Sequence, residues 1–153
     1  MDIKKHTHPD MLEKYSFLWS EARLVIAAVA LFVGGFPPIF LLLRILPIPA
    51  LLGTIGLLLT VAWIVSGVAS GYLLYRWIKG GKKLFGAHVQ LDMIAFLVTV
   101  VSGFNLGITG ITGRNIGMSL LPLYPVFVIT ALAYLWSAYH LYTRFNASGK
   151  KLF

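Results

Sequence analysis

The chain has no cysteine and few charges. Without cysteine it has no disulfide, thiolate metal site or cysteine nucleophile. Charged residues make up 12% of the 153, where an ordinary soluble domain has about 25%, and only five are acidic. The sequence contains no hydrolase elbow, phosphate-binding loop, dinucleotide fingerprint or HExxH motif. We therefore predict that the protein is not an enzyme and has no metal site.

The missing charges leave long apolar stretches, which dominate what is present. Three of these stretches carry no charge, and a fourth carries only Asp92. About 20 apolar residues suffice for one helix to cross a bilayer. We predict four transmembrane helices, at 24–43, 51–75, 87–108 and 121–143. The first stretch is too long for the core of a cleavable signal, so we expect that helix to remain in the mature protein.

Part of the sequence occurs twice. The pentapeptide at 81–85 (GKKLF) returns 68 residues later at 149–153, and similar apolar residues precede both copies. This pattern indicates a tandem duplication of a two-helix unit. The predicted fold is an all-α membrane protein whose four transmembrane helices form two tandem hairpins, related as parallel repeats. We divide it into a pre-segment at 1–23, a first unit at 24–85 and a second at 86–153.

The basic residues predict an orientation. Only Arg44 and Arg114 lie on one side of the predicted bundle. The other basic residues share the opposite side: Lys4, Lys5, Lys14, Arg23, Arg76, Lys79, Lys82, Lys83, Arg144, Lys150 and Lys151. The positive-inside rule then places both termini in the cytoplasm and the protein in the cell (inner) membrane. Short basic clusters beside a membrane also contact anionic lipid, so we predict no nucleic-acid partner. The pre-segment has apolar residues at helical spacing and is predicted to lie on the membrane surface as an amphipathic helix.

Proline and asparagine mark the interior of two predicted helices. Pro37 and Pro38 lie inside the first predicted helix, where they would kink or break it and free backbone carbonyls. Asn105 occupies the equivalent place in the second unit. A buried amide is costly unless it is hydrogen-bonded. We expect Asn105 to face the bundle and to bond to carbonyls near Gly34.

Two pairs of glycines predict close helix packing. Gly67 and Gly71 are four residues apart in the second predicted helix, and Gly103 and Gly107 in the third. Small residues at this spacing let helix backbones approach each other within a membrane. The pairs serve either packing inside the chain or self-association.

Asp92 is the most conspicuous single residue, because it is the only acidic residue after Glu21. An ionisable group inside a membrane is a functional-site hypothesis by default. His88 is one helical turn earlier, and His140 is predicted at similar depth on the antiparallel fourth helix.

Four interpretations of this Asp92, His88 and His140 cluster stay open. It could be purely structural, or it could relay protons or ions. The two histidines could hold a b-type haem, although no cofactor is predicted. The three side chains could also bind a divalent metal.

Three functions follow from these features. The first is a non-enzymatic accessory or scaffold subunit that packs against itself or another membrane subunit within the lipid bilayer. The alternative is a small oligomeric transporter or channel using Asp92, His88, His140, Asn105 and the proline break. The third is a haem- or metal-binding redox subunit.

Overall fold

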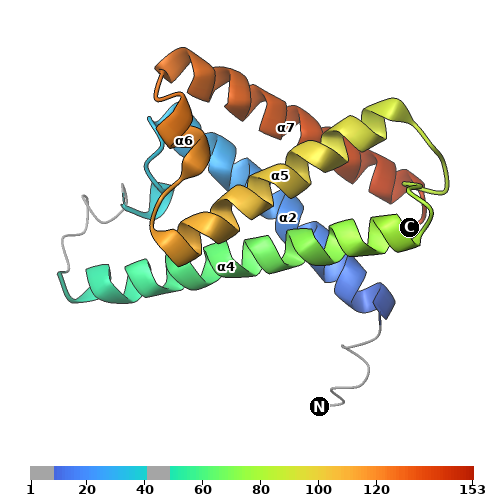
Figure 1. The fold of residues 1–153 in the computed structure, drawn as a ribbon, viewed down its shortest axis with the longest axis horizontal. Coiled ribbons are helices and arrows are strands. Elements are labelled where there is room, and N and C mark those ends of the chain that lie inside the picture. Colours follow the sequence, from blue (N-terminus) through green and yellow to red (C-terminus); the bar gives the residue numbers. More distant parts are fainter. Residues whose placement is uncertain (1–8, 41–48) are drawn as a thin grey trace.

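The computed structural model describes residues 9–40 and 49–153, and this part of the chain is helical without any strand (Figure 1). The helices are α2 (Pro9–Phe32), α4 (Pro49–Lys79), α5 (Gln90–Thr112), α6 (Ile116–Leu120) and α7 (Tyr124–Ala147). The four long helices are all long and apolar enough to cross a membrane. At 1.5 Å per residue, even the 23 residues of α5 extend about 34 Å, more than a bilayer core of about 30 Å.

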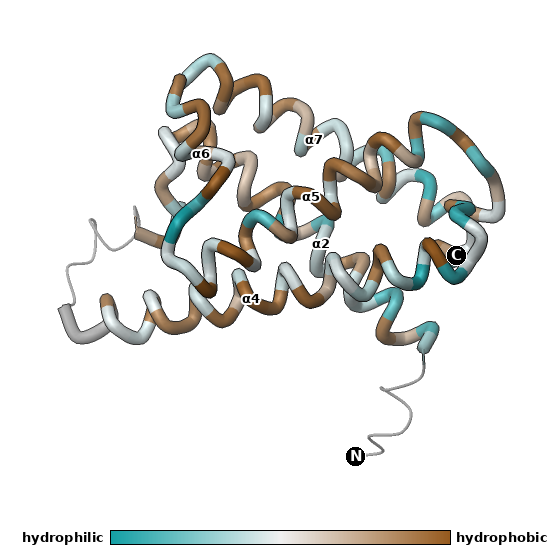
Figure 2. Tube along the Cα trace, viewed as in Figure 1, coloured by the Kyte–Doolittle hydropathy of each residue, from teal (hydrophilic) through white to brown (hydrophobic). Residues whose placement is uncertain are grey.

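The outer surfaces of these helices are apolar. Leu57, Val68 and Ile111 are between 65% and 77% exposed, and many other large apolar side chains face outward. Figure 2 shows hydrophilic residues mainly near the helix ends and in the connecting loops. A protein surrounded by water rarely exposes such continuous apolar surface. The structure is therefore that of a membrane-embedded helical protein.

Helix α2 differs from the prediction. It begins at Pro9, near the acidic Asp10 that favours a helix N-terminus, and runs without interruption to Phe32. The predicted pre-segment at 1–23 is therefore not a separate surface helix. Its described part, from residue 9 onward, belongs to the same helix as the first span. Residues 41–43 of the predicted span lie outside the described residues.

The helix break that the sequence predicts at Pro37 and Pro38 occurs earlier in the structure, at the end of α2. Gly34 and Gly35 have φ values of +81° and +89°, in the left-handed region that ends helices. Pro37 and Pro38 therefore follow the end of α2 and do not interrupt it. The helix thus breaks a few residues before the predicted place, since the glycines end α2 first and a helical segment begins again at Pro38.

Helices α4 and α5 pack against each other at glycines. A Cβ atom placed on Gly67 would lie 2.8 Å from the Cα of Gly107, and one on Gly107 would lie 2.7 Å from the Cα of Gly67. A Cβ on Gly103 would overlap Ser70, and one on Gly71 would touch the ring of Phe104. The glycines predicted to pack thus do so within the chain. They allow the extensive contact between α4 and α5, while α2 packs mainly on α7.

The main apolar core fills one end of the bundle, where α4 and α7 end. Its aromatic rings are in direct contact, with centroids 4.6 Å apart for Phe17 and Phe145 and 5.5 Å apart for Trp77 and Phe96. Such pairs add about 0.5–1.5 kcal/mol each beyond the area they bury. We call this end the aromatic end. It joins all four long helices, because Phe17 lies on α2 and Phe96 on α5.

The two GKKLF segments have the same local structure at this end. Each follows a long helix with two residues of positive φ, 73° and 61° at 81–82 and 69° and 65° at 149–150. In each, the N–H of the lysine donates to a carbonyl five residues earlier at 2.9 Å, which caps the helix. Leu84 and Leu152 are both buried in the core, and the Phe85 N–H donates to the Leu152 carbonyl at 2.7 Å. The two segments therefore cap α4 and α7 in the same way, and the two caps lie next to each other.

Candidate intramembrane site

A layer of buried polar side chains crosses the bundle halfway along its helices. Arg23, near the middle of α2, is 6% exposed. Its Nη1 donates to the Ser102 hydroxyl at 3.0 Å and its Nη2 donates to the Thr99 carbonyl at 2.8 Å, both near the middle of α5. On the same helix, Trp19 Nε1 donates to the Ser66 hydroxyl of α4 at 3.1 Å. These hydrogen bonds fix the position of α2 along its axis relative to α4 and α5.

Glu21 is the second ionisable group of this layer. It is 5% exposed, and neither carboxylate oxygen has a hydrogen-bond partner among the described residues. Glu21 shares a helix face with Phe17 and Ala28, because it lies four residues after one and seven before the other. Phe17 contacts Phe145 and Ala28 packs with Ala131, so this face lies against α7.

The part of α7 at this level is also polar. The Phe17–Phe145 and Ala28–Ala131 contacts fix the antiparallel register, which brings Glu21 to the level of residues 138–141, within about one helical turn of Ser137. The hydroxyls of Ser20 and Ser137 are buried without a partner in the described part of the chain, like the Glu21 carboxylate. Unpaired buried polar groups cost free energy, and ionisable ones within a membrane mark functional sites.

Glu21 and Arg23 are not among the site residues predicted from the sequence, because their charges suggest a position outside the membrane. The sequence does contain a signal for them. Between Pro9 and Gly34 no proline or glycine ends the helix, and apolar residues recur at helical spacing. One continuous helix carries both residues to its middle, where they are buried.

A cavity of about 710 Å³ begins at this polar layer and extends away from the aromatic end. It is bounded by the second halves of α2 and α5 and by parts of the first halves of α4 and α7, so all four long helices contribute. Among the residues that the structure describes, Arg23 is the only charged one that lines it, and most of its wall is apolar. The segment with Gly35 and Pro37 and the region of Met118 line its far end. The main core therefore fills one half of the bundle, and the other half, which we call the hollow half, contains the cavity beside a smaller apolar cluster of Ala28, Leu31 and Ala131.

Asn105 lies beside this hollow half, but it bonds differently from the prediction. Its Nδ2 donates to Asn115 Oδ1 at 2.9 Å, and its Oδ1 accepts from the Gly117 N–H at 3.2 Å. Asn115 Oδ1 also accepts from the Met118 N–H at 3.1 Å, which caps the short helix α6. The expected bonds to carbonyls near Gly34 were wrong, because the turn after α5 folds back onto Asn105.

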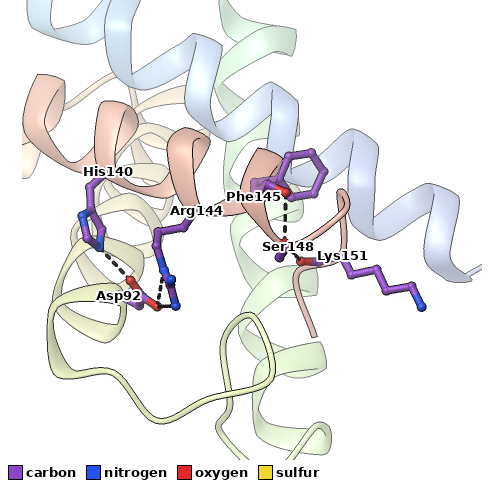
Figure 3. A network of polar contacts seen from close by, with 6 residues as sticks. All are labelled: Asp92, His140, Arg144, Phe145, Ser148 and Lys151. Carbon is purple, nitrogen blue, oxygen red and sulfur yellow. Dashed lines mark hydrogen bonds and ion pairs between the residues drawn. The ribbon is translucent and has the colours of Figure 1, made fainter.

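Asp92 belongs to a separate ion cluster at the aromatic end (Figure 3). Its carboxylate is fully buried, with Oδ1 2.7 Å from His140 Nε2 and Oδ2 accepting from Arg144 Nε and Nη2 at 3.1 and 3.0 Å. Arg144 also lies over the ring of Phe85, and His140 stacks on Trp136. Both of these partners of Asp92 lie on α7, so the cluster links α5 to α7, and we call it the Asp92 clamp.

His88 does not join that cluster. It lies before α5, which starts at Gln90 after an extended Val89, so the helical spacing between His88 and Asp92 does not apply. His88 is exposed and lines a small separate cavity with Lys82. Among the described residues no three histidine, aspartate or glutamate side chains are grouped to hold a metal ion. The predicted trio is therefore reduced to Asp92 and His140, with Arg144 as the partner that was not foreseen.

No known protein family, no curated protein and no solved structure matches this chain.

Proposed function

We propose that the protein is a non-enzymatic integral membrane protein that binds a small amphiphilic solute between its four long helices, as a carrier does. The observation that supports this is the cavity of about 710 Å³, which ends at the buried polar layer. Ligand cavities are about 300–1,000 Å³, mainly apolar, with a few polar groups that orient the ligand. Substrate sites of membrane carriers often lie near the bilayer midplane, the level expected for Arg23 halfway along α2.

A cavity-filling variant tests this proposal. Ala62 on α4 lines the cavity, whereas Val68 on the same helix is 68% exposed and does not. In nanodiscs of a neutral lipid, brominated decanol should quench tryptophan fluorescence saturably, because Trp19 and Trp63 line the cavity. Ala62→Phe should leave only the linear quenching caused by partition into lipid, while Val68→Phe should behave like the wild type. Unchanged saturable quenching in Ala62→Phe would contradict the proposal.

We also propose that the termini and the 80–89 loop face the cytoplasm, with the hollow half toward the opposite side. The exposed lysines at 82–83 and 150–151 support this orientation. Because the chain lacks cysteine, single-cysteine variants report topology directly. In spheroplasts, an impermeant maleimide should label Arg114→Cys and should label Lys82→Cys only after lysis. The reverse labelling pattern would show the opposite orientation.

The matching caps at 81–85 and 149–153 support an origin by duplication.

The second candidate function is the accessory or scaffold subunit. One observation favours it: among the described side chains of the first turns of α4, from Leu52 to Thr60, none is buried. A Cβ atom placed on Gly53 or Gly56 there would meet no other atom within 4 Å, so another subunit could approach closely. Glycines Gly67 and Gly107 do not support this function, since they already pack on each other. A protein with only this role should show no saturable decanol quenching and should migrate with a partner when purified from mild detergent.

A further inference from the structure

The hydrogen bonds and charge of Arg23 determine which kind of ligand the cavity would favour. A guanidinium has five N–H donors and keeps its positive charge at all physiological pH values. In this structure Arg23 donates to one hydroxyl and one carbonyl, both uncharged, and its Nε is buried without a partner. No ion pair involves Arg23 in the described part of the chain. The cavity therefore ends at a positive charge that lacks a bonded counter-ion.

Glu21 acts on Arg23 only through space, since the two side chains form no ion pair in the described part of the chain. Residues two apart on a helix do not face each other, and Glu21 lies on the side of α2 that packs against α7. Its carboxylate makes no hydrogen bond or ion pair within the described residues, and it does not line the cavity. A buried charge without a close partner is costly, and an anion that reaches it offsets part of this cost. Arg23 is the only charge that the described residues place on the cavity wall, so this wall favours an anion over a cation.

The rest of the wall determines the shape of the ligand. Beyond Arg23 the cavity is bordered by apolar side chains, including Ile26, Val29, Leu59 and Phe127. This surface suits a hydrocarbon chain, since burial of apolar surface stabilises by about 25 cal/mol per Å². A cavity of about 710 Å³ lies in the size range of a single small ligand.

We infer that the cavity binds a single-chain amphiphile with an anionic head, a carboxylate or a phosphate, whose head contacts Arg23 and whose chain lies along the apolar wall. This inference rests on the proposed binding function and adds its ligand class. Arg23 is then the residue that determines specificity, and Ser102 is a positioning residue because it fixes the guanidinium through Nη1.

The test compares brominated decanoate with brominated decanol in neutral-lipid nanodiscs, at a pH where decanoate is ionised. Hydrogen bonds to a charged group exceed those between neutral groups, so the wild type should bind decanoate at least about tenfold more tightly than decanol. Arg23→Gln should bind both probes equally. Arg23→Lys, which keeps the charge, should retain most of the preference for decanoate. Equal binding of both probes by the wild type would overturn the anionic head and leave the binding function intact. If neither probe binds saturably, both proposals fail.

A further arm distinguishes the source of the anion and guards against misfolding. If an anionic bilayer lipid with two chains occupies the cavity instead, nanodiscs containing phosphatidylglycerol should suppress decanoate quenching, and this result would overturn the single chain while keeping the anionic head. If the occupant is a free amphiphile, decanoate should still bind there, and decyl phosphate should compete with it. Inorganic phosphate should compete with neither probe, because it lacks the chain. Should Arg23→Gln not fold, the preference of the wild type for decanoate over decanol decides the question alone, and decyltrimethylammonium should then bind more weakly than decanol.

Discussion

Gly67→Leu is expected to separate α4 from α5 and to destabilise the folded bundle by about 3 kcal/mol, the upper part of the usual range for overpacking. The cost is high because the opposing atom is the Cα of Gly107, which is backbone and cannot rotate away. We expect the transition in a detergent-denaturation series, followed by circular dichroism, to move to milder conditions. The variant should also elute earlier and more broadly than the wild type in size exclusion.

Gly53→Leu is the matched control, because it makes the same chemical change on the same helix. A Cβ on Gly53 meets no atom within 4 Å, and leucine favours the helix more than glycine does. Its unfolding transition should occur under the same conditions as that of the wild type, or under harsher ones. Equal losses in Gly67→Leu and Gly53→Leu would show that the close backbone contact is not what holds α4 on α5.

Arg144→Met should also be destabilising, by about 2 kcal/mol, because it removes two hydrogen bonds from a fully buried carboxylate, whereas the Arg144 side chain itself is 39% exposed. The Asp92 carboxylate is fully buried and would keep only His140 as a partner. Thermal unfolding in detergent measures the effect.

The double variant Asp92→Asn/Arg144→Met is the control for this prediction. It removes both charges and should recover most of the loss, because an uncharged amide can still bond to His140. If the double variant is as unstable as Arg144→Met, the loss comes from the packing of Arg144 on Phe85 and not from the buried carboxylate.

The sequence predicts three of the four long helices well, because long uncharged stretches have few alternatives to spanning a membrane. The predicted spans at 51–75, 87–108 and 121–143 fall within or close to α4, α5 and α7. The prediction is wrong for α2, because it begins the helix at residue 24, directly after the charged Arg23, whereas the helix begins at Pro9. Glu13 shows why this boundary is wrong: it is buried and accepts hydrogen bonds from Arg76 at 3.0 and 2.7 Å. A paired charge can lie inside a helix bundle, and composition alone does not reveal pairing.

The site was predictable only in part, for a related reason. Antiparallel helices of similar length correctly suggested that Asp92 and His140 lie at one level, and the structure brings them together. The position of His88 depended on where α5 begins, and helix ends are poorly defined by an apolar pattern. Arg23 and Glu21 were missed because their burial depends on α5 and α7, which contact α2 only in the folded chain.

The division of the bundle into a filled and a hollow half has a mechanical consequence. At the aromatic end, stacked rings, two adjacent caps and the Asp92 clamp tie the helices together, so that end is stiff. Beyond the polar layer the helices surround the cavity, and α2 is joined to α7 there by a smaller cluster of Ala28, Leu31 and Ala131 and by a hydrogen bond from the Tyr124 hydroxyl to the Phe32 carbonyl. We therefore expect the aromatic end to keep its structure when the width of the cavity changes, so that any movement is confined to the half of the bundle that holds the cavity.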